Sequence, residues 1–229
     1  SIELKLQQLR QRIGDACTLA QRPVQSVTLL AVSKTHRPDA VRQAHAAGQH
    51  AFGENYVQEA LAKIDALADL RAALEWHLIG PLQSNKTREV AAAFDWVHTV
   101  DRLKIAERLS AQRPEHLPPL QVCVQVNVSG EASKSGVEPE HVAALAQAIA
   151  ALPRLRLRGL MSIPEPVDDF GAQRAPHRRL RELFDALRSQ GLLLDTLSMG
   201  MSADLEAAIA EGSTLVRVGS AIFGARPAA

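Results

Sequence analysis

A lysine stands at the end of the first short apolar run of the chain. The run, VTLLAVS at residues 27–33, has the composition of a strand buried on both faces, and Lys34 follows it directly. A lysine at the rim of a buried strand is expected to be partly desolvated, and desolvation favours the neutral, nucleophilic amine. A nucleophilic lysine in a pocket predicts Schiff-base chemistry with a carbonyl compound. The alternative is an amine that extends from the strand end into bulk water.

Glycine and serine residues follow two later strand patterns and predict an anion site. Gly200 ends the strand expected at 195–200 and Ser202 follows it, while Gly219 ends the last expected strand and Ser220 follows it. Glycine lets backbone N–H groups approach a ligand closely, and serine adds a hydroxyl donor. Such loops at the starts of helices favour phosphate. The alternative is that the glycines only make tight turns and that Ser202 only caps the following helix.

Arg217 alternates with Leu215 and Gly219 along the last expected strand, so the three residues share one face. An arginine that is buried on that face needs an acceptor. A ring nitrogen of a bound cofactor fits this need, and so does a carboxylate such as Asp204 or Glu206. A nucleophilic lysine, a phosphate loop and an arginine that faces a ring acceptor together predict pyridoxal 5′-phosphate (PLP) as the cofactor.

The other candidate residues favour structural interpretations. His77 lies within an expected strand and predicts a hydrogen-bonded core residue, with a general base as the alternative. Cys17 and Cys123 lie within apolar patterns and are expected to be core residues. The eight histidines and two cysteines show no spacing typical of a zinc site. The sequence therefore predicts no metal site.

Strand and helix patterns alternate along the whole chain, and this alternation must position the candidate residues. Strands are expected at 27–33, 50–55, 75–80, 95–100, 121–128, 155–162, 195–200 and 214–219. Helices are expected at 2–20, 38–47, 56–70, 84–94, 102–112, 139–151, 173–190 and 203–211. The pattern predicts an α/β fold, a (β/α)8 TIM barrel with an additional N-terminal helix, as a single domain over residues 1–229. A doubly wound open sheet is the alternative. A barrel carries its site at the carboxyl ends of the strands.

Composition excludes several classes of protein. With 229 residues, of which 46% are hydrophobic and 22% charged, the chain is expected to be globular rather than disordered. A net charge of +1 and an aromatic content of 3% argue against a nucleic-acid-binding protein and against binding to an acidic membrane. The sequence predicts no membrane span and no signal peptide. The expected compartment is the cytoplasm, where both cysteines stay reduced.

Five long segments carry a resemblance to a known family. They are AVSKT (31–35), FGENYVQE (52–59), EWHLIGPLQSNK (75–86), LRGLMSIP (157–164) and MGMSADLEAAIAEGSTLVRVGSAIFG (199–224). They resemble the pyridoxal phosphate homeostasis proteins, the YggS/PROSC-like family, whose fold is a barrel like the N-terminal domain of alanine racemase. The resemblance implies a PLP aldimine on Lys34. It also implies that the ring side is contacted by Asn55 and Arg217, that the phosphate is held by Ser202, Gly219 and Ser220, and that Lys134 lies near the cofactor.

The chain differs from the racemases that share this barrel. It ends at Ala229 soon after the last expected strand, its only tyrosine is Tyr56, and Ile163 stands near the position of a racemase histidine. Racemisation needs a base on each face of the substrate. We therefore expect a monomeric, non-enzymatic PLP-binding protein that acts in intracellular PLP homeostasis or delivery, with PLP-dependent apo-enzymes as partners. A weakly active amino-acid racemase is the leading alternative, and a class I aldolase-like lyase is a third.

Overall fold

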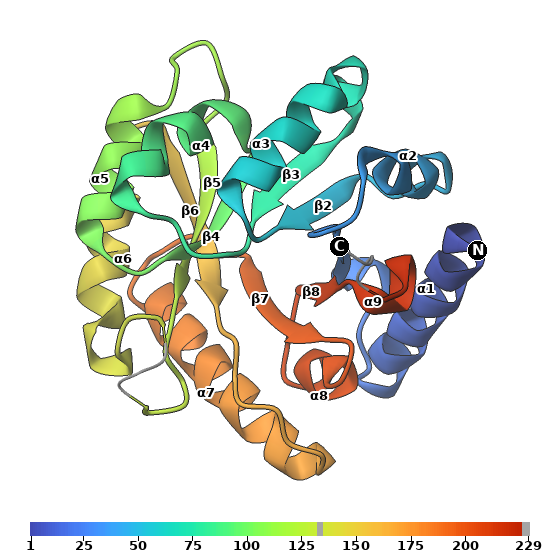
Figure 1. The fold of residues 1–229 in the computed structure, drawn as a ribbon. Coiled ribbons are helices and arrows are strands. Elements are labelled where there is room, and N and C mark those ends of the chain that lie inside the picture. Colours follow the sequence, from blue (N-terminus) through green and yellow to red (C-terminus); the bar gives the residue numbers. More distant parts are fainter. Residues whose placement is uncertain (132–134, 226–229) are drawn as a thin grey trace.

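The fold is described by a computed structural model that covers residues 1–131 and 135–225. These residues form a closed sheet of eight parallel strands in sequential order (Figure 1). The strands are β1 (Thr28–Val32), β2 (Ala51–Glu54), β3 (Glu75–Leu78), β4 (Trp96–Val100), β5 (Leu120–Gln125), β6 (Leu155–Met161), β7 (Thr196–Met201) and β8 (Leu215–Val218). Because β8 pairs with β1, the sheet closes on itself. The predicted (β/α)8 barrel is confirmed, and the open doubly wound sheet is wrong.

An outer layer of helices surrounds the sheet (Figure 1). The α-helices are α1 (Ile2–Leu19), α2 (Pro38–Ala46), α3 (Val57–Ala66), α4 (Thr87–Ala93), α5 (Leu103–Gln112), α6 (Val142–Ala150), α7 (Phe170–Ser189), α8 (Leu205–Ala210) and α9 (Ser220–Phe223). Short 3-10 helices are η1 (Val24–Ser26), η2 (Ala68–Ala73), η3 (Ser84–Lys86) and η4 (Pro139–His141). Within the described part of the chain, none of the helices has the length and apolar character needed to cross a membrane.

The predicted additional helix is α1, which lies beside the closure of the barrel. Ser1 begins it, because the Ser1 hydroxyl accepts a hydrogen bond from the Leu4 N–H. Leu6, Leu9 and Ile13 are buried at helical spacing and give the helix one apolar face. This face packs against α2, α8 and α9, so α1 joins the first and last helices of the outer layer.

The core has two parts, one between the sheet and the helices and one inside the barrel. The interior holds two apolar clusters, formed by Leu30, Val32, Ala51, Ile79 and Leu215 and by Trp96, Cys123 and Met161. Buried polar side chains share the interior faces of four strands, and these are His77, His98, Ser198 and Arg217. Cys17 and Cys123 are both buried, as predicted.

Two element ends illustrate how the structure differs from the expected ranges. The helix expected at 56–70 ends at Ala66, because Leu67 leaves the helical conformation and a 3-10 turn follows. The strand expected at 121–128 ends at Gln125, where its partner β6 also ends. Beyond that point Val126 makes an isolated bridge with Val137 rather than a ladder. Both differences depend on neighbouring elements, which local patterns do not report.

Candidate functional site

The carboxyl ends of β1 and β8 meet at one pocket. The two strands pair with Ala31 opposite Val218, so the residues that follow them lie side by side. A Cβ on Gly219 would lie 3.2 Å from the Val32 carbonyl oxygen, a close approach that glycine permits. The pocket has a volume of about 170 Å³ and is lined by Val32, Lys34, Thr35, His36, Tyr56, Gly219, Ser220 and Gly224. The structure thus brings the candidate lysine together with one of the two predicted phosphate loops.

The side chain of Lys34 is exposed, so the expectation of partial desolvation is wrong. Among the described residues its amine has neither a hydrogen-bond partner nor an ion-pair partner. The amine extends into water from the strand end, as in the alternative interpretation. It nevertheless lines the pocket beside Gly219 and Ser220, so a ligand in the pocket can contact it directly.

The backbone on both sides of Lys34 is held in place. The carbonyl of Ser33 accepts a hydrogen bond from Lys63 Nζ at 2.7 Å. Thr35 has a positive φ of 68°, and its N–H donates to Glu59 Oε2 at 2.8 Å. A left-handed threonine persists only where surrounding contacts determine it. These neighbours therefore set the direction in which the lysine leaves β1.

Glu54, Glu59 and Lys63 form an acid–base cluster beneath this segment, which sequence reasoning missed. Glu54 and Lys63 are buried, and the Glu59 side chain is 32% exposed. Lys63 Nζ lies 2.8 Å from Glu54 Oε2 and 3.0 Å from Glu59 Oε2. The Ser33 hydroxyl also donates to Glu54 Oε2. Because Glu54 is fully buried, its pKa is raised to about 7 despite the neighbouring ammonium. The sequence signal that could have found the cluster is the spacing of Glu59 and Lys63 on one helix face.

The loop after β7 carries Gly200 and Ser202, the other pair of residues that the sequence predicts to bind phosphate. Gly200 has a φ of 105°, and a Cβ there would lie 2.6 Å from the Cβ of Ala208, so the position requires glycine. Ser202 is half-buried, and its carbonyl accepts a hydrogen bond from Arg12 at 2.7 Å. Ser202 is not among the residues that line the pocket described above. It lies on the neighbouring loop at the same end of the barrel, since β7 pairs with β8.

Asp204, and not Ser202, is the N-cap residue of α8. Its Oδ1 accepts from the Met201 N–H at 2.8 Å, and its Oδ2 lies 2.8 Å from His177 Nε2. Burial favours the neutral acid, but these two hydrogen bonds outweigh it and lower the pKa of Asp204. The alternative in which Ser202 serves only as a helix cap is therefore wrong. Among the described residues the Ser202 hydroxyl has no hydrogen-bond partner, which leaves it available to a ligand.

Arg217 is buried inside the barrel mouth, with 3% of its surface exposed. Its guanidinium donates to Ser198 Oγ at 2.7 Å and to the carbonyl of Ser162 at 2.9 Å. Within the described residues it forms no ion pair with Asp204 or Glu206, so the carboxylate alternative is wrong; Glu206 instead accepts from Arg12. Burial lowers the pKa of Arg217 to about 10, so the group stays charged at neutral pH.

Besides Glu54 Oε1, two buried polar atoms near the carboxyl ends of strands lack a protein partner within the described residues. They are Asn55 Oδ1, which follows β2, and Ser162 Oγ, which follows β6. Because a buried polar atom without a hydrogen bond is costly, these positions suit a polar ligand. Together with an accessible amine and a buried cation, they fit PLP. Lys134 lies outside the described residues, and the only tyrosine, Tyr56, is about half exposed in the lysine pocket.

His77 is a hydrogen-bonded core residue, as predicted. It is 1% exposed, and its two ring nitrogens face His98 and Glu75 at 2.8 and 2.7 Å. Its ring stacks on Trp96 with centroids 5.0 Å apart. Because both ring nitrogens already have protein partners, neither is free to accept a proton from a substrate. This disfavours the general-base alternative.

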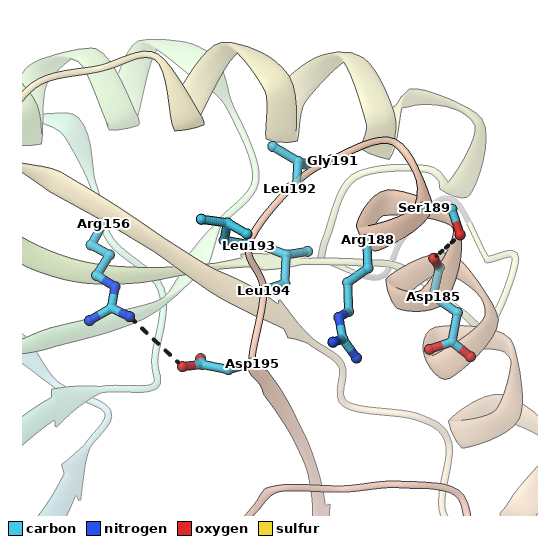
Figure 2. Close-up of a pocket in the computed structure, with 9 residues that line it drawn as sticks. All are labelled: Arg156, Asp185, Arg188, Ser189, Gly191, Leu192, Leu193, Leu194 and Asp195. Carbon is cyan, nitrogen blue, oxygen red and sulfur yellow. Dashed lines mark hydrogen bonds and ion pairs between the residues drawn. The ribbon is translucent and has the colours of Figure 1, made fainter.

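A larger pocket, of about 680 Å³, lies at the opposite end of the barrel (Figure 2). The segment 191–195 that leads into β7 forms one wall, and the end of α7 forms another. Figure 2 shows Arg156 pointing toward Asp195, with 4.0 Å between the charged groups. Leu193 is 93% exposed there. The nine lining residues include no lysine and no buried polar atom without a partner, so this pocket is not a candidate for PLP.

Comparison with known proteins identifies the family. The family model of the alanine racemase N-terminal domain matches residues 4–227. The chain belongs to this family. It is 64% identical over 215 residues to the pyridoxal phosphate homeostasis protein of Pseudomonas aeruginosa, which covers 94% of this chain and 91% of the relative. It is 57% identical over 228 residues to the protein of the same name from Vibrio cholerae, which covers 99% of this chain and 97% of the relative. The resemblance that the sequence motifs indicate is confirmed.

A solved member of this fold family contains the expected cofactor. The structure of PipY from Synechococcus elongatus with PLP bound superimposes with a TM-score of 0.85 at 40% sequence identity. The match covers 98% of this chain and all of PipY, at 100%. The similarity therefore extends over the whole barrel, including the strand ends that carry the candidate residues.

Proposed function

We propose that this chain binds PLP at the carboxyl end of its barrel and takes part in intracellular PLP homeostasis or delivery. The observation that carries the proposal is the pocket that joins Lys34 to Gly219 and Ser220. It is supported by relatives named pyridoxal phosphate homeostasis proteins and by the PipY structure with PLP bound. PLP supplies an aldehyde, a phosphate and a pyridine ring, and the site offers a group suited to each.

The pocket residues divide between the aldehyde and the phosphate. Lys34 supplies the ε-amine whose nitrogen forms a double bond to the aldehyde carbon, with the aldehyde oxygen leaving as water. Gly219 and Ser220 hold the phosphate through backbone N–H groups and a hydroxyl, and Ser202 adds its free hydroxyl from the neighbouring loop. Lys134 is proposed to lie near the cofactor.

Arg217 and Asn55 are proposed to contact the ring side. A guanidinium can only donate hydrogen bonds, so an arginine beside the pyridine nitrogen favours the unprotonated ring. An unprotonated ring withdraws electrons weakly and stabilises a carbanion less. This choice of partner suits a protein that holds the cofactor rather than one that uses it as a strong electron sink.

The exposure of Lys34 supports reversible binding. An incoming amine can reach the same carbon that Lys34 holds, because the lysine stands at the solvent edge of the pocket. We therefore propose a non-enzymatic carrier whose recipients are PLP-dependent apo-enzymes, acting in the cytoplasm as a monomer. A weak amino-acid racemase is the second candidate, because Tyr56 lines the pocket with Lys34 and could serve as a second base.

Reductive trapping tests the proposed site. The protein is incubated with PLP, reduced with borohydride, digested and analysed by mass spectrometry. We expect the added mass on Lys34 and not on Lys104, an exposed lysine of α5 that serves as the control. A label spread evenly over the lysines, or one that leaves Lys34 unmodified, would overturn the proposal.

Two assays separate the carrier from the racemase. A panel of amino acids is tested for racemisation by the PLP-loaded protein, and transfer of PLP to an apo-enzyme is followed by recovery of that enzyme's activity. Transfer without turnover supports the carrier. Turnover on the order of 1 s⁻¹ or more lies within the usual enzyme range and would instead support the racemase. Sedimentation equilibrium tests the proposed monomer.

A further inference from the structure

A row of hydrogen-bonded polar side chains crosses the barrel interior. Arg217 donates to Ser198 Oγ at 2.7 Å, and Ser198 Oγ lies 2.8 Å from His98 Nδ1. His98 Nε2 lies 2.8 Å from His77 Nδ1, and His77 Nε2 lies 2.7 Å from Glu75 Oε1. The first four side chains are buried, and the row reaches solvent at Glu75, whose side chain is 50% exposed.

The two ends of this row fix the direction of every hydrogen bond in it. A guanidinium has only donors and an ionised carboxylate has only acceptors. Ser198 Oγ accepts from Arg217 and its own proton is then directed to His98 Nδ1. His98 must carry its proton on Nε2 and donate to His77 Nδ1, and His77 in turn donates from Nε2 to Glu75. With both imidazoles neutral, this is the one arrangement that satisfies all four bonds.

The electrostatics of the row agree with this arrangement. Burial, reinforced by the positive charge of Arg217, holds the pKa of His98 well below its ordinary value, so its ring is neutral at pH 7. The hydrogen bond from His77 lowers the pKa of Glu75 and keeps it ionised. Trp96 stacks on His77 with 15° between the rings, and the Arg158 guanidinium lies 4.6 Å from the Trp96 ring centroid. These contacts hold the His77 ring in its plane.

The ends of the row lie at opposite mouths of the barrel. Glu75 begins β3 and lines a pocket of about 230 Å³ at the amino-terminal mouth, where Arg158 and Asp195 are the other charged groups. Arg217 is the last residue but one of β8, beside the carbonyl of Ser162 at the carboxyl-terminal mouth. The row therefore connects a solvent-accessible carboxylate with the guanidinium of the proposed ring site.

We propose that Ser198, His98, His77 and Glu75 are positioning residues for Arg217, which hold its guanidinium toward the pyridine nitrogen of PLP from inside the barrel. The inference rests on the proposed function for its ligand. Among the described residues, Arg217 forms no ion pair with a carboxylate. The row instead connects its guanidinium to the Glu75 carboxylate through a chain of hydrogen bonds that all point the same way. The proposal predicts that a change at the amino-terminal mouth alters cofactor binding at the other end.

Nitrogen NMR of the unliganded protein tests the direction of the row without any cofactor. With ¹⁵N-labelled histidine, His98 is expected to be neutral at pH 7, and the neutral form of each ring is expected to carry its proton on Nε2. Assignment uses the His77→Gln and His98→Gln variants. A proton on Nδ1 of either ring, or a charged His98, would overturn the proposed arrangement in the wild-type protein, whatever the variants do.

Substitutions at the far end test the connection to Arg217. Glu75→Leu removes the final acceptor and is expected to weaken PLP binding about tenfold and to shift the visible absorption maximum of bound PLP. Glu75→Gln keeps an oxygen acceptor for His77 and is expected to restore the wild-type absorption maximum. Thr196→Val is the matched control, because Thr196 lines the same pocket and its hydroxyl donates to Asp195 instead of to the row.

The outcomes separate this inference from the proposed function. If wild-type protein binds no PLP, the proposed function fails and the role of the row in cofactor binding fails with it. If wild-type protein binds PLP but Glu75→Leu has the wild-type affinity and spectrum, only the positioning role is overturned. If Glu75→Leu does not fold, Ser198→Ala at the middle of the row is measured in its place, with the same expected result.

Discussion

The two cations of the proposed site are held in opposite ways. Lys34 has a solvent-exposed side chain on a backbone segment held by Lys63 and Glu59. Arg217 has a buried side chain whose guanidinium is bound by Ser198 and by the carbonyl of Ser162. An amine on a fixed backbone keeps its position but can exchange partners, whereas a buried, doubly bound guanidinium keeps one direction. The difference suits a site that must hold a ring in place and release an aldehyde.

The largest expected effect comes from removing the exposed amine itself. Lys34→Ala should abolish the covalent attachment of PLP, seen as loss of the visible absorption band after gel filtration. Because the exposed side chain makes no hydrogen bond or ion pair with the described residues, the free energy of unfolding should change by no more than about 0.5 kcal/mol. A band retained in this variant would contradict the role of Lys34.

Lys63, which holds the backbone beside Lys34, is expected to contribute several kcal/mol to the free energy of unfolding. Lys63→Met leaves Glu54 buried without its ammonium partner and should lower the free energy of unfolding by about 3 kcal/mol. Urea denaturation followed by circular dichroism measures it. Lys104→Met, which changes an exposed lysine in the same way, should change stability by less than about 0.5 kcal/mol. If the two variants are equally stable, the cluster of Glu54, Glu59 and Lys63 does not stabilise the backbone beside Lys34.

The raised pKa of Glu54 predicts a pH-dependent stability of definite sign. The pKa is about 7 in the folded protein against an ordinary value of 4.5, so the folded state binds the proton more tightly. The stability that this proton contributes is present below pH 4.5 and is lost as the pH rises toward 7. Relative to wild type, Glu54→Gln should therefore gain about 1–3 kcal/mol between pH 5 and pH 8.

Urea titrations at several pH values measure this change. Glu59→Gln is the control, because hydrogen bonds outweigh burial and lower the pKa of Glu59. Its stability difference from wild type should be nearly constant over the same range. A Glu54→Gln difference that is also constant would show that Glu54 is ionised in the folded state throughout, against the raised pKa.

The smallest effect is expected at the neighbouring phosphate loop. Ser202→Ala should weaken PLP binding about fivefold, the cost of one hydrogen bond to a charged group that backbone donors still hold. Fluorescence titration with PLP measures the dissociation constant. Ser189→Ala at the end of α7 is the exposed control and should bind as wild type does. An unchanged constant in Ser202→Ala would place the phosphate on Gly219 and Ser220 alone.

Much of the fold could be predicted because its signals are local. Apolar runs of strand length alternate with amphipathic helical patterns, and a parallel sheet with such connections has few ways to arrange itself. Eight units then predict a closed barrel, which the structure confirms. Knowing that sites lie at the carboxyl ends of barrel strands was enough to select Lys34, Gly219 and Ser220, which share one pocket.

The contacts of the site could not be predicted, because each joins elements that are distant in sequence. Lys63 reaches from α3 to the carbonyl of Ser33 on the first strand–helix connection. Arg217 donates to Ser198 on β7 and to the carbonyl of Ser162, which follows β6, although nearby carboxylates were the obvious partners in sequence. The burial of a side chain also depends on the complete fold. For this reason the sequence predicted a partly desolvated Lys34, whereas the structure has an exposed side chain there.

The sequence by itself determined the order and type of the elements, the family and the residue types that could meet a cofactor. Those properties depend on spacing along one chain, where hydrophobic periodicity and turn residues act locally. Only the tertiary structure decided which side chains are buried and which hydrogen bonds they make, including the row from Arg217 to Glu75. Barrel closure brings eight strands around one axis, and that closure sets every distance across the interior.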